Sequence, residues 1–467
     1  MNTEINQNSA EVFAHSQFKN LRHDDRRVCD RVIQVCAKIN QNPGKPFSRI
    51  FTNSADRKAA FRVVANHSLT TGMLVESICS ATREKLLQTQ PALVVAVQDT
   101  SSITREKWRK ARNLGPVGCK GSQVFFFHSM MAMTELGVPI GLLDLKLWTR
   151  KKVKKSREDW KTKNIEKKES FRWLTSVRDG CHFLPETTKV IVVSDRESDI
   201  HEYLEDLISE EISFVVRVNH NRRTEGGNIR AELNSAPVLG EIDVPIPRVN
   251  RREKEVVRFT VQAQEVTTKL RKGGLVIHRS RRPFSLWGLL IKGETAEGKK
   301  LEWLLYTDQP IHDLESAREV VRIYTLRWRI EEFHMVLKTG MRAEKNRFQD
   351  GLHMQRLLLL CAPMAIKLLE LMYLSRAEPD KLLAEVVSKE EEKAVMALAE
   401  EQTHNPPQNL TVGEAVKYIA FSGGWQGRKG DGPPGVRTLW EGWRDVQFLA
   451  SFILRRDGKA DGVPPCG

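Results

Sequence analysis

The sequence lacks several patterns that would assign a class of protein at once. None of its seven cysteines forms a CxxC pair, and their odd number and wide spacing argue against a disulfide framework and a zinc ribbon. None of the 12 histidines has the HxxxH or HxH spacing of a zinc site. Internal repeats of the solenoid type are also missing. We therefore expect a protein of a reducing compartment that does not bind zinc.

A long uncharged hydrophobic run is missing as well. The most apolar stretch, residues 357–374, contains Lys367 and Glu370, which favours a core helix over a membrane span. The first residues, MNTEINQNSAEVF, are polar and acidic and do not resemble a secretory leader. We expect a cytoplasmic protein with no membrane partner.

Positive charge is what the sequence has in excess. The 467 residues include 74 Lys and Arg against 59 Asp and Glu, a formal net charge of +15. This excess predicts a polyanionic partner, nucleic acid first and an anionic membrane surface second. The length predicts two or three domains, and a hydrophobic content of 40% with 10 Trp and 18 Phe excludes a mostly disordered chain.

Three regions differ in character. Residues 1–85 are predicted to be helical and to bind DNA through basic residues that include Arg26, Arg27 and Arg62, although each of these alone is more typical of a solvated helix face. Residues 86–350 are predicted to form an α/β catalytic domain with a β-rich insertion at about 219–310. Residues 351–467 are predicted to be a helical C-terminal region, with a Gly/Pro-rich loop at 422–435 and a last helix at 438–455.

The strand-like runs of the middle region follow the order β-β-β-α-β-α-β. They lie at residues 92–98, 125–134, 140–149, 189–194 and 212–218. The first three suit an antiparallel meander, with Gly137 and Pro139 in a hairpin turn. The last two need helical crossovers and should be parallel. The charged stretch that begins KKVKKSR and ends near Asp179 is compatible with a helix. This mixed sheet has the ribonuclease H-like order.

Two carboxylates end neighbouring strands of this predicted sheet. Asp99 follows ALVVAVQ and Asp195 follows KVIVVS. A strand-end aspartate taken alone is commonly a cap for the next loop or helix. Two such carboxylates side by side repel each other, and the usual relief is a divalent cation such as Mg²⁺, which prefers oxygen ligands. The pair therefore indicates a magnesium site.

A third element is the segment from Tyr324 to Lys338, YTLRWRIEEFHMVLK. Treated as one helix, it places Tyr324, Arg327, Glu331 and Lys338 on one narrow face and apolar side chains on the opposite face. A surface helix with internal salt bridges is one interpretation. The other is a carboxylate delivered to a metal site and flanked by cations that bind phosphates.

These motifs together resemble a known family. The Y-x2-R-x3-E-x6-K run, with Asp99 in QDTSS and Asp195 in SDRESDI, is similar to the DDE cut-and-paste transposases of bacterial insertion sequences, in the branch with the YREK signature. The segments around Arg217 (FVVRVNH) and Trp303 (EWLLYT), and LWEGW at 439–443, also resemble that family. The likeness extends over nearly the whole chain and is loosest at the N-terminus.

The resemblance implies a mechanism and partners. Asp99, Asp195 and Glu331 would be catalytic ligands of two Mg²⁺ ions, with Mn²⁺ as a substitute and Asp99 as the bridging ligand. Water would release a 3′-OH at the transposon end, the 3′-OH would form a hairpin that water reopens, and the freed 3′-OH would attack target DNA. The partners would be double-stranded DNA and a second copy of the chain, joined through the C-terminal helices in a nucleoid-associated complex.

The resemblance also implies roles in DNA binding. Tyr324, Arg327 and Lys338 would hold phosphates. Trp303 would stack on a flipped base, or else be a core aromatic residue of its strand. Arg217 would contact the transposon end, or else pair with a nearby carboxylate. Glu197 and Asp199 lie close to Asp195 and are interpreted as helix-start residues.

Two other functions remain open at this point. The chain is either a transposase, a DNA-binding protein whose catalytic site is vestigial, or a ribonuclease H-like nuclease that cuts without pairing two DNA ends. The intact set of three carboxylates disfavours the vestigial site, and the helical C-terminal region disfavours the simple nuclease.

Overall fold

The computed structural model describes residues 9–105, 111–117, 122–150, 164–247, 254–269, 283–340, 348–403 and 408–460. Several segments of interest lie outside these ranges, so that nothing is said of their structure. They are the KKVKKSR stretch, most of the basic turns of the insertion, and Cys119 and Cys466.

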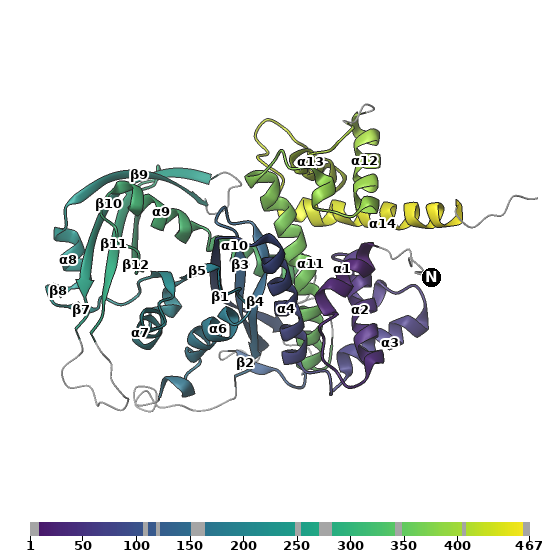
Figure 1. The fold of residues 1–467 in the computed structure, drawn as a ribbon, viewed down its shortest axis with the longest axis horizontal. Coiled ribbons are helices and arrows are strands. Elements are labelled where there is room, and N and C mark those ends of the chain that lie inside the picture. Colours follow the sequence, from purple (N-terminus) through teal and green to yellow (C-terminus); the bar gives the residue numbers. More distant parts are fainter. Residues whose placement is uncertain are drawn as a thin grey trace, which may run out of the picture.

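The N-terminal region is helical, as predicted. Its elements are α1 (Ser9–Phe18), α2 (Arg26–Gln41), the 3₁₀ turn η1 (Phe47–Arg49), α3 (Ser54–Ala65) and α4 (Thr71–Thr89). Polar side chains cap these helices at their starts: Asp25 accepts from the amide of Arg27, and Asn53 accepts from the amide of Asp56. Helices α2, α3 and α4 pack against α11, which belongs to the far end of the chain (Figure 1).

A mixed sheet forms the centre of the molecule (Figure 1). Its first part consists of β1 (Leu93–Arg105), β2 (Gly115–Val117), β3 (Ser122–Met133), β4 (Pro139–Trp148), β5 (Lys189–Ser194) and β6 (Ser213–Arg217). Strand β3 pairs antiparallel with β1 and β4, whereas β1 pairs parallel with β5 and β5 pairs parallel with β6. The predicted ribonuclease H-like strand order is confirmed.

The crossover elements differ in part from the prediction. They are η2 (Ile165–Lys167), α6 (Phe171–Cys181), η3 (Arg196–Ser198) and α7 (His201–Ser209). The expected helix between β4 and β5 is therefore, within the described residues, a helix that begins only at Phe171. The β3–β4 turn is the predicted hairpin, and Gly137 takes the left-handed conformation there with φ 78°.

The β-rich insertion continues the same sheet. It contains β7 (Arg223–Thr224), β8 (Gly227–Asn228), α8 (Ile229–Ser235), β9 (Val238–Pro247), β10 (Lys254–Thr267), β11 (Ser285–Glu294) and β12 (Lys300–Thr307). Strand β12 pairs antiparallel with β6, so that the described strands β9 to β12 extend the catalytic sheet rather than forming a separate one. Alternation alone did not reveal this, because pairing partners are not encoded in the local pattern.

Helices resume after the sheet. They are α9 (Leu314–Thr325), α10 (Trp328–Met335), the π-helical turn η4 (Val336–Gly340), α11 (Gly351–Ala377), the 3₁₀ turn η6 (Leu383–Glu385), α12 (Lys389–Thr403), α13 (Val412–Ser422) and α14 (Val436–Ala460). Among the described residues, α11 is the one helix long and apolar enough to cross a membrane, and 83% of its apolar window is buried inside the protein. This burial fits the core helix expected at 357–374.

The prediction of one continuous helix over 324–338 is wrong. Helix α9 ends at Thr325 and α10 begins at Trp328. At the break, the amide of Arg327 donates to the carbonyl of Tyr324 and the amide of Ile330 donates to that of Arg327, which is the tighter i→i−3 spacing. Lys338 lies in the π-helical turn that follows α10. The segment therefore bends, and its face is not one straight stripe.

Candidate active site

The alternation of the two central strands places Asp99 and Asp195 on one face of the sheet. Val95 and Val97 of β1 face the core that contains α10 and α11, and so does Val193 of β5. Val97 is opposite Val193 in the parallel ladder. Two residues further along each chain stand Asp99 and Asp195, so both carboxylates leave the sheet on the α10 side.

The electrostatics of Asp99 agree with this placement. Burial first, and then the negative charge of Asp195, raise the pKa of Asp99 to about 7. The amide of Thr100 donates to Asp99 Oδ1 at 2.7 Å, which opposes the shift only in part. Asp195 keeps one oxygen occupied as the cap of η3, where Oδ1 accepts from the amide of Glu197 at 2.8 Å.

Glu331 approaches the pair from α10 but is held by an arginine. Arg327 Nη2 lies 2.6 Å from Glu331 Oε1, and Arg327 Nη1 lies 3.5 Å from Asp99 Oδ2. The side chain of Arg327 is 10% exposed and that of Glu331 is 53% exposed. One guanidinium therefore stands between the strand-borne Asp99 and the helix-borne Glu331.

Three contacts fix helix α10, which carries Glu331, and helix α9, which precedes it. Arg322 of α9 donates to the carbonyl of Glu135 at 2.8 Å, and Arg329 of α10 donates to that of Leu136 at 2.9 Å, so both bind the β3–β4 hairpin. His334 Nε2 lies 3.2 Å from the hydroxyl of Ser129, which is opposite Asp99 in the β1–β3 ladder. Glu331 precedes His334 by one helical turn, so the contact of His334 with Ser129 holds the backbone of Glu331 on the side of Asp99.

Three predicted DNA-binding residues form one cluster next to the carboxylates. Arg217, at the end of β6, lies over the rings of Trp303 and Tyr324 at 5.6 and 6.0 Å. Its Nη1 is 3.5 Å from the hydroxyl of Tyr324 and its Nη2 is 3.3 Å from the carbonyl of Glu302. Arg217 thus bonds a carbonyl and a tyrosine in these contacts, not the carboxylate considered as the alternative.

Two members of this cluster, one on helix α9 and one on strand β12, are buried. Tyr324 is 2% exposed and Trp303 is 5% exposed. The Trp303 ring packs against Tyr324, Trp328 and Phe259. The alternative interpretation of Trp303 as a core aromatic residue therefore describes the DNA-free structure, and a base can stack on it only after these neighbours move.

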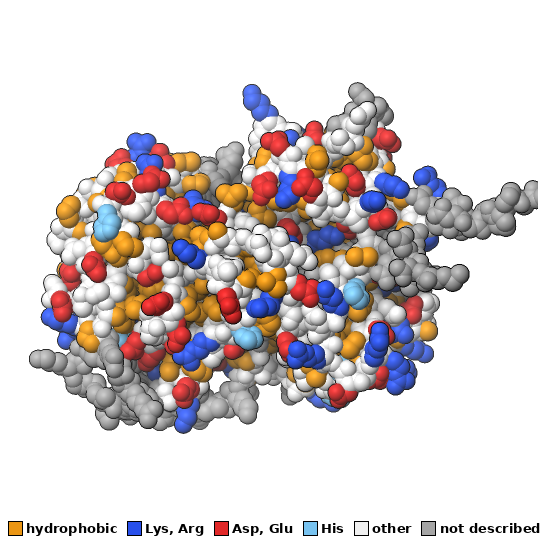
Figure 2. All heavy atoms as spheres, in the orientation of Figure 1, with side chains coloured by type: hydrophobic (Ala, Val, Ile, Leu, Met, Phe, Trp, Pro, Cys, Tyr) orange, Lys and Arg blue, Asp and Glu red, His pale blue; other side chains and the backbone are white. Residues whose placement is uncertain are grey.

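The other predicted DNA-binding residues are more accessible. Lys338 is half-buried, and the Lys338 charge helps to lower the pKa of the buried His334 to about 3, after the larger effect of burial. Arg26, Arg27 and Arg62 are exposed on α2 and α3, and Arg27 pairs with Asp25 at 3.1 Å. Figure 2 shows Lys and Arg side chains gathered over the part of the molecule where these helices lie in Figure 1.

The two acidic residues after Asp195 are not free helix-start carboxylates. Asp199 is 2% exposed and accepts from the amides of Asn219 and His220, and it pairs with Arg222 at 2.5 Å. Glu197 pairs with Arg172 of α6 at 2.8 Å. Both are therefore occupied by structural contacts and do not compete with Asp195. Arg172 was not among the predicted residues, and nothing in the local sequence separates it from the other basic residues.

The residues fit a divalent cation in part. Asp99 and Asp195 offer oxygen ligands on one face, and their mutual repulsion is what a cation relieves. In the described part of the chain, however, no three His, Cys, Asp or Glu side chains stand together as a metal-binding group. The pairing of Glu331 with Arg327 is the physical reason, since Glu331 would join the aspartates only by leaving that arginine.

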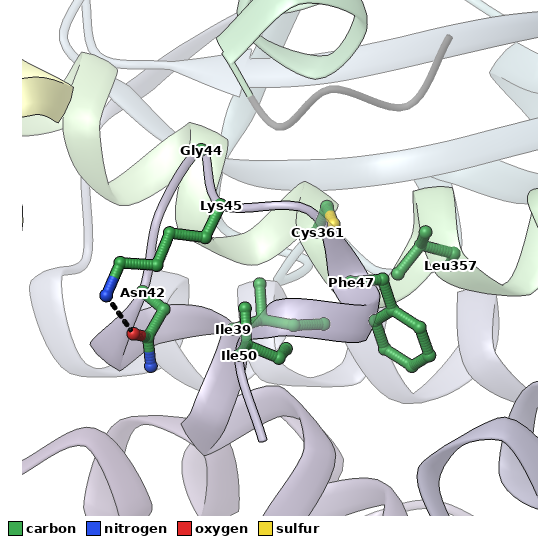
Figure 3. Close-up of a pocket in the computed structure, with 8 residues that line it drawn as sticks. All are labelled: Ile39, Asn42, Gly44, Lys45, Phe47, Ile50, Leu357 and Cys361. Atoms are coloured by element: carbon green, nitrogen blue, oxygen red, sulfur yellow. Dashed lines mark hydrogen bonds between the residues drawn. The ribbon is translucent and has the colours of Figure 1, made fainter. Parts of the chain in front are cut away.

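The cleft between the N-terminal region and α11 is too small to be a catalytic site. The cleft lined by Asn42, Lys45 and Phe47 of the N-terminal region and by Leu357 and Cys361 of α11 (Figure 3) has a volume of about 10 Å³. This is room for about one water molecule. Its only charged lining residue, Lys45, turns outward and bonds Asn42 at 2.9 Å.

Comparison with known proteins now defines the class. Residues 172–365 match the family model of the transposase DDE domain, and residues 363–456 match that of the transposase Tn5 dimerisation domain. Both models describe transposases, and together they cover residues 172–456, so the chain is similar to the DDE transposases over this range. Within this class it is similar to the Tn5 family, and its placement in the YREK branch remains a prediction. Transposase DDE domains generally use divalent metal ions.

One solved structure gives a weaker likeness. The piggyBac transposase, in a synaptic complex with hairpin DNA, aligns with 98% of this chain and 74% of its own chain, at 10% sequence identity and a TM-score of 0.37. A likeness at this level carries no argument about this chain.

Proposed function

We propose that this protein is a cut-and-paste transposase that binds transposon ends, pairs two ends as a homodimer, and cleaves and joins DNA in the bacterial cytoplasm on nucleoid DNA. The observation that carries the proposal is the placement of Asp99 and Asp195 on one face, just beyond the last parallel pair of β1 and β5, with Glu331 one arginine away. This is the arrangement that phosphoryl transfer with oxygen-bound metal ions needs.

Asp99, Asp195 and Glu331 would hold two Mg²⁺ ions, for which Mn²⁺ can substitute, with Asp99 as the shared ligand. When bound, such ions activate the attacking oxygen and stabilise the leaving oxygen of an in-line displacement. Arg327 would turn from Glu331 to a DNA phosphate, since a guanidinium binds phosphate and carboxylate alike. The same pocket would serve first-strand cleavage, hairpin formation, hairpin opening and strand transfer, because each is an in-line transfer at phosphorus.

The neighbouring cluster would hold the bent DNA end. Arg217, Tyr324 and Lys338 would bind phosphates around the hairpin, and Trp303 would stack on an extruded base. Trp303 lies beneath Arg217, so a phosphate that draws Arg217 away would remove one of the side chains that cover the indole. Stacking of a base on an aromatic side chain contributes about 1–3 kcal/mol, which offsets the cost of extruding the base.

The dimer is proposed to form through α14. Phe448 and Phe452, one turn apart on this helix, are 68% and 55% exposed, and they lie within the residues that match the Tn5 dimerisation domain. A double Phe448→Ser, Phe452→Ser variant should stay folded and fail to pair two ends, as should a chain truncated before Ser422. Pairing of two ends by the truncated chain, in a gel-shift assay with two DNA lengths, would contradict this interface.

The test of the function uses the inverted repeats that flank the gene as substrate. With Mg²⁺ and a plasmid target, the purified protein should nick the repeat, form a hairpin and join the end to the target. Specific binding without cleavage would favour the DNA-binding protein with a vestigial site. Full-rate cutting of unpaired ends by a monomer would favour the non-synaptic nuclease.

A further inference from the structure

Arg172 links the two segments that carry the aspartates, one inside β1 and one directly after β5. Its Nε donates to the hydroxyl of Thr100 at 3.1 Å, and its Nη2 donates to Glu197 at 2.8 Å. Thr100 directly follows Asp99, and Glu197 stands two residues after Asp195. A third bond, from Nη1 to the carbonyl of Glu169 at 2.8 Å, leaves each nitrogen of the guanidinium with a partner.

This link lies beyond the last backbone pair that joins strands β1 and β5. The last pair in the parallel ladder between β1 and β5 is Val97 with Val193. Asp99 is still paired to Ser129 of β3, but Asp195 lies beyond the end of β5. The backbone ladder therefore does not fix the separation of the two carboxylates, and Arg172 spans the gap from the opposite face of the sheet.

The guanidinium is itself held firmly. The side chain of Arg172 is 12% exposed, and its charged end lies 5.1 Å from the ring of Trp148 and 5.7 Å from that of Trp173. Because a guanidinium is a planar fork with fixed donor directions, packing of its face also fixes where its nitrogens point. Arg172 is therefore a rigid strut rather than a mobile surface cation.

A buried chain of hydrogen bonds continues this strut behind Asp99. The Thr100 hydroxyl accepts from Arg172 and lies 2.9 Å from Nδ1 of His128. Because the other ring nitrogen faces the acceptor oxygen of Gln98, Nδ1 is the unprotonated one and the hydroxyl donates to it. Burial, and then the charge of Arg172, hold the pKa of His128 well below its ordinary value, so the ring is neutral and its Nε2–H donates to Gln98 at 3.0 Å. Gln98 donates in turn to Tyr203 at 3.0 Å. Both chain neighbours of Asp99 are thus tied to the layer that contains Arg172.

We infer that Arg172 is a positioning residue that sets the spacing of Asp99 and Asp195, and thereby the affinity of this pair for a divalent cation. This inference rests on the proposed function, which makes the two aspartates metal ligands. Arg172 acts through Thr100 and Glu197 and touches neither carboxylate in the contacts described.

The sign of one measurement separates positioning from simple charge. Removal of a cation near two carboxylates should tighten the binding of a metal ion if Arg172 acts only through its charge. Removal of a positioning strut should weaken it, and loss of a residue that orients metal ligands typically costs about 10-fold to 100-fold in affinity. The two roles therefore predict opposite changes.

The experiment measures binding of Mn²⁺ alone to the full-length, DNA-free protein by calorimetry. Arg172→Gln should weaken Mn²⁺ binding by about tenfold or more. Arg172→Lys should not restore it, because an ammonium group keeps the charge but not the fork. The matched control is Arg178→Gln on the same helix, which breaks the ion pair with Asp206 of α7 and should leave Mn²⁺ affinity unchanged.

Two readouts keep the outcomes distinct. Thermal unfolding reports whether Arg172→Gln and Arg178→Gln are folded and comparably destabilised. Unchanged or tighter Mn²⁺ binding by folded Arg172→Gln, or full restoration by Arg172→Lys, would overturn the positioning role. If Asp99→Ala and Asp195→Ala bind Mn²⁺ as the wild type does, the metal site of the proposed function fails instead, whatever Arg172→Gln shows.

Discussion

The two sides of the candidate active site are built differently. The floor carries Asp99 within β1 and Asp195 directly after β5, and the side chain of Asp99 is only 16% exposed. The wall carries Glu331 on α10, a helix of eight residues between a tightened turn and a π-helical turn, with its side chain 53% exposed. Each side has its own arginine, Arg172 behind the floor and Arg327 in front of the wall.

Asp99 and Asp195 therefore form a preformed half of the site, whereas Glu331 is a ligand that can move. The strands and the buried hydrogen bonds determine where the aspartates lie before any DNA or metal ion binds. Glu331 can change partner by rotation of an exposed side chain, which costs little beyond its contact with Arg327. A phosphate that binds Arg327 would release Glu331, so DNA binding would complete the site.

The largest expected effect is the loss of cleavage when a carboxylate is removed. Asp99→Ala, Asp195→Ala and Glu331→Ala should each lower the rate of end cleavage by about 10³-fold or more, which corresponds to about 4 kcal/mol in the barrier. Specific binding to the transposon end should remain in all three, as measured by gel shift. Loss of end binding in all three variants would contradict the catalytic assignment.

The second effect is a pH dependence of the free energy of unfolding, which arises from Asp99 in the floor. Because the folded pKa of Asp99 is raised from 3.8 to about 7, Asp99 favours the folded state most below about pH 4, and this contribution disappears as the pH rises through 7. The loss amounts to a few kcal/mol, since one pKa unit corresponds to about 1.4 kcal/mol. Asp99→Asn, which cannot ionise, should therefore be more stable than the wild type near pH 8 in EDTA.

The measurement is the free energy of unfolding in urea at several pH values between about 5 and 8. The advantage of Asp99→Asn should shrink toward acid pH. Added Mg²⁺ should stabilise the wild type near pH 8 and leave Asp99→Asn nearly unchanged, because the ion relieves the repulsion with Asp195. An advantage of Asp99→Asn that stays the same at every pH would show that Asp99 is not the titrating group.

The floor could be predicted from the sequence and much of the wall could not. Strand alternation is a local signal, and it placed Asp99 and Asp195 correctly on adjacent parallel strands. Asp195 directly follows β5, as predicted, but Asp99 lies inside β1, which continues to Arg105 instead of ending at Gln98 because it stays paired with β3. The break at Leu326 and Arg327 and the burial of Tyr324 depend on packing against the sheet, which a helical pattern does not contain. Arg172 and Thr100 are 72 residues apart in the chain, so no local pattern reveals their bond.

The third effect concerns Trp303, which lies on the sheet and packs against the wall through Tyr324 and Trp328. Trp303→Ala should impair hairpin formation more than first-strand nicking. Because Trp303 is 5% exposed, the cavity left by alanine would also cost about 3–5 kcal/mol in stability. Trp303→Phe is the better variant and should slow hairpin formation by about tenfold, within the range of base–aromatic stacking.

The control for Trp303 is Trp287→Phe on the adjacent strand β11, whose ring packs against His312 instead of the wall. It should leave both steps unchanged in a single-turnover assay that resolves nicked and hairpin products. Equal slowing of nicking and hairpin formation by Trp303→Phe would count against the role of Trp303 in stacking.

The smallest expected effect is the change in metal affinity that follows removal of Arg327. In the DNA-free protein this arginine lies 2.6 Å from Glu331 and 3.5 Å from Asp99, so it competes with a cation for the same oxygens. Arg327→Gln should therefore tighten Mn²⁺ binding by at least about fivefold, since a unit charge at about 4 Å contributes about 1 kcal/mol even at the dielectric constant of water. Calorimetry on the DNA-free protein measures this directly.

Removal of Arg327 and removal of Arg172 should change Mn²⁺ affinity in opposite directions. Arg327→Gln removes a competitor for the carboxylates, whereas Arg172→Gln removes the strut that spaces them. The control is Arg318→Gln, an exposed residue of α9 that removes the same charge away from the carboxylates and should leave the affinity unchanged. If Arg327→Gln weakened Mn²⁺ binding as Arg172→Gln should, Arg327 would be positioning Glu331 rather than withholding it, and the wall would be as preformed as the floor.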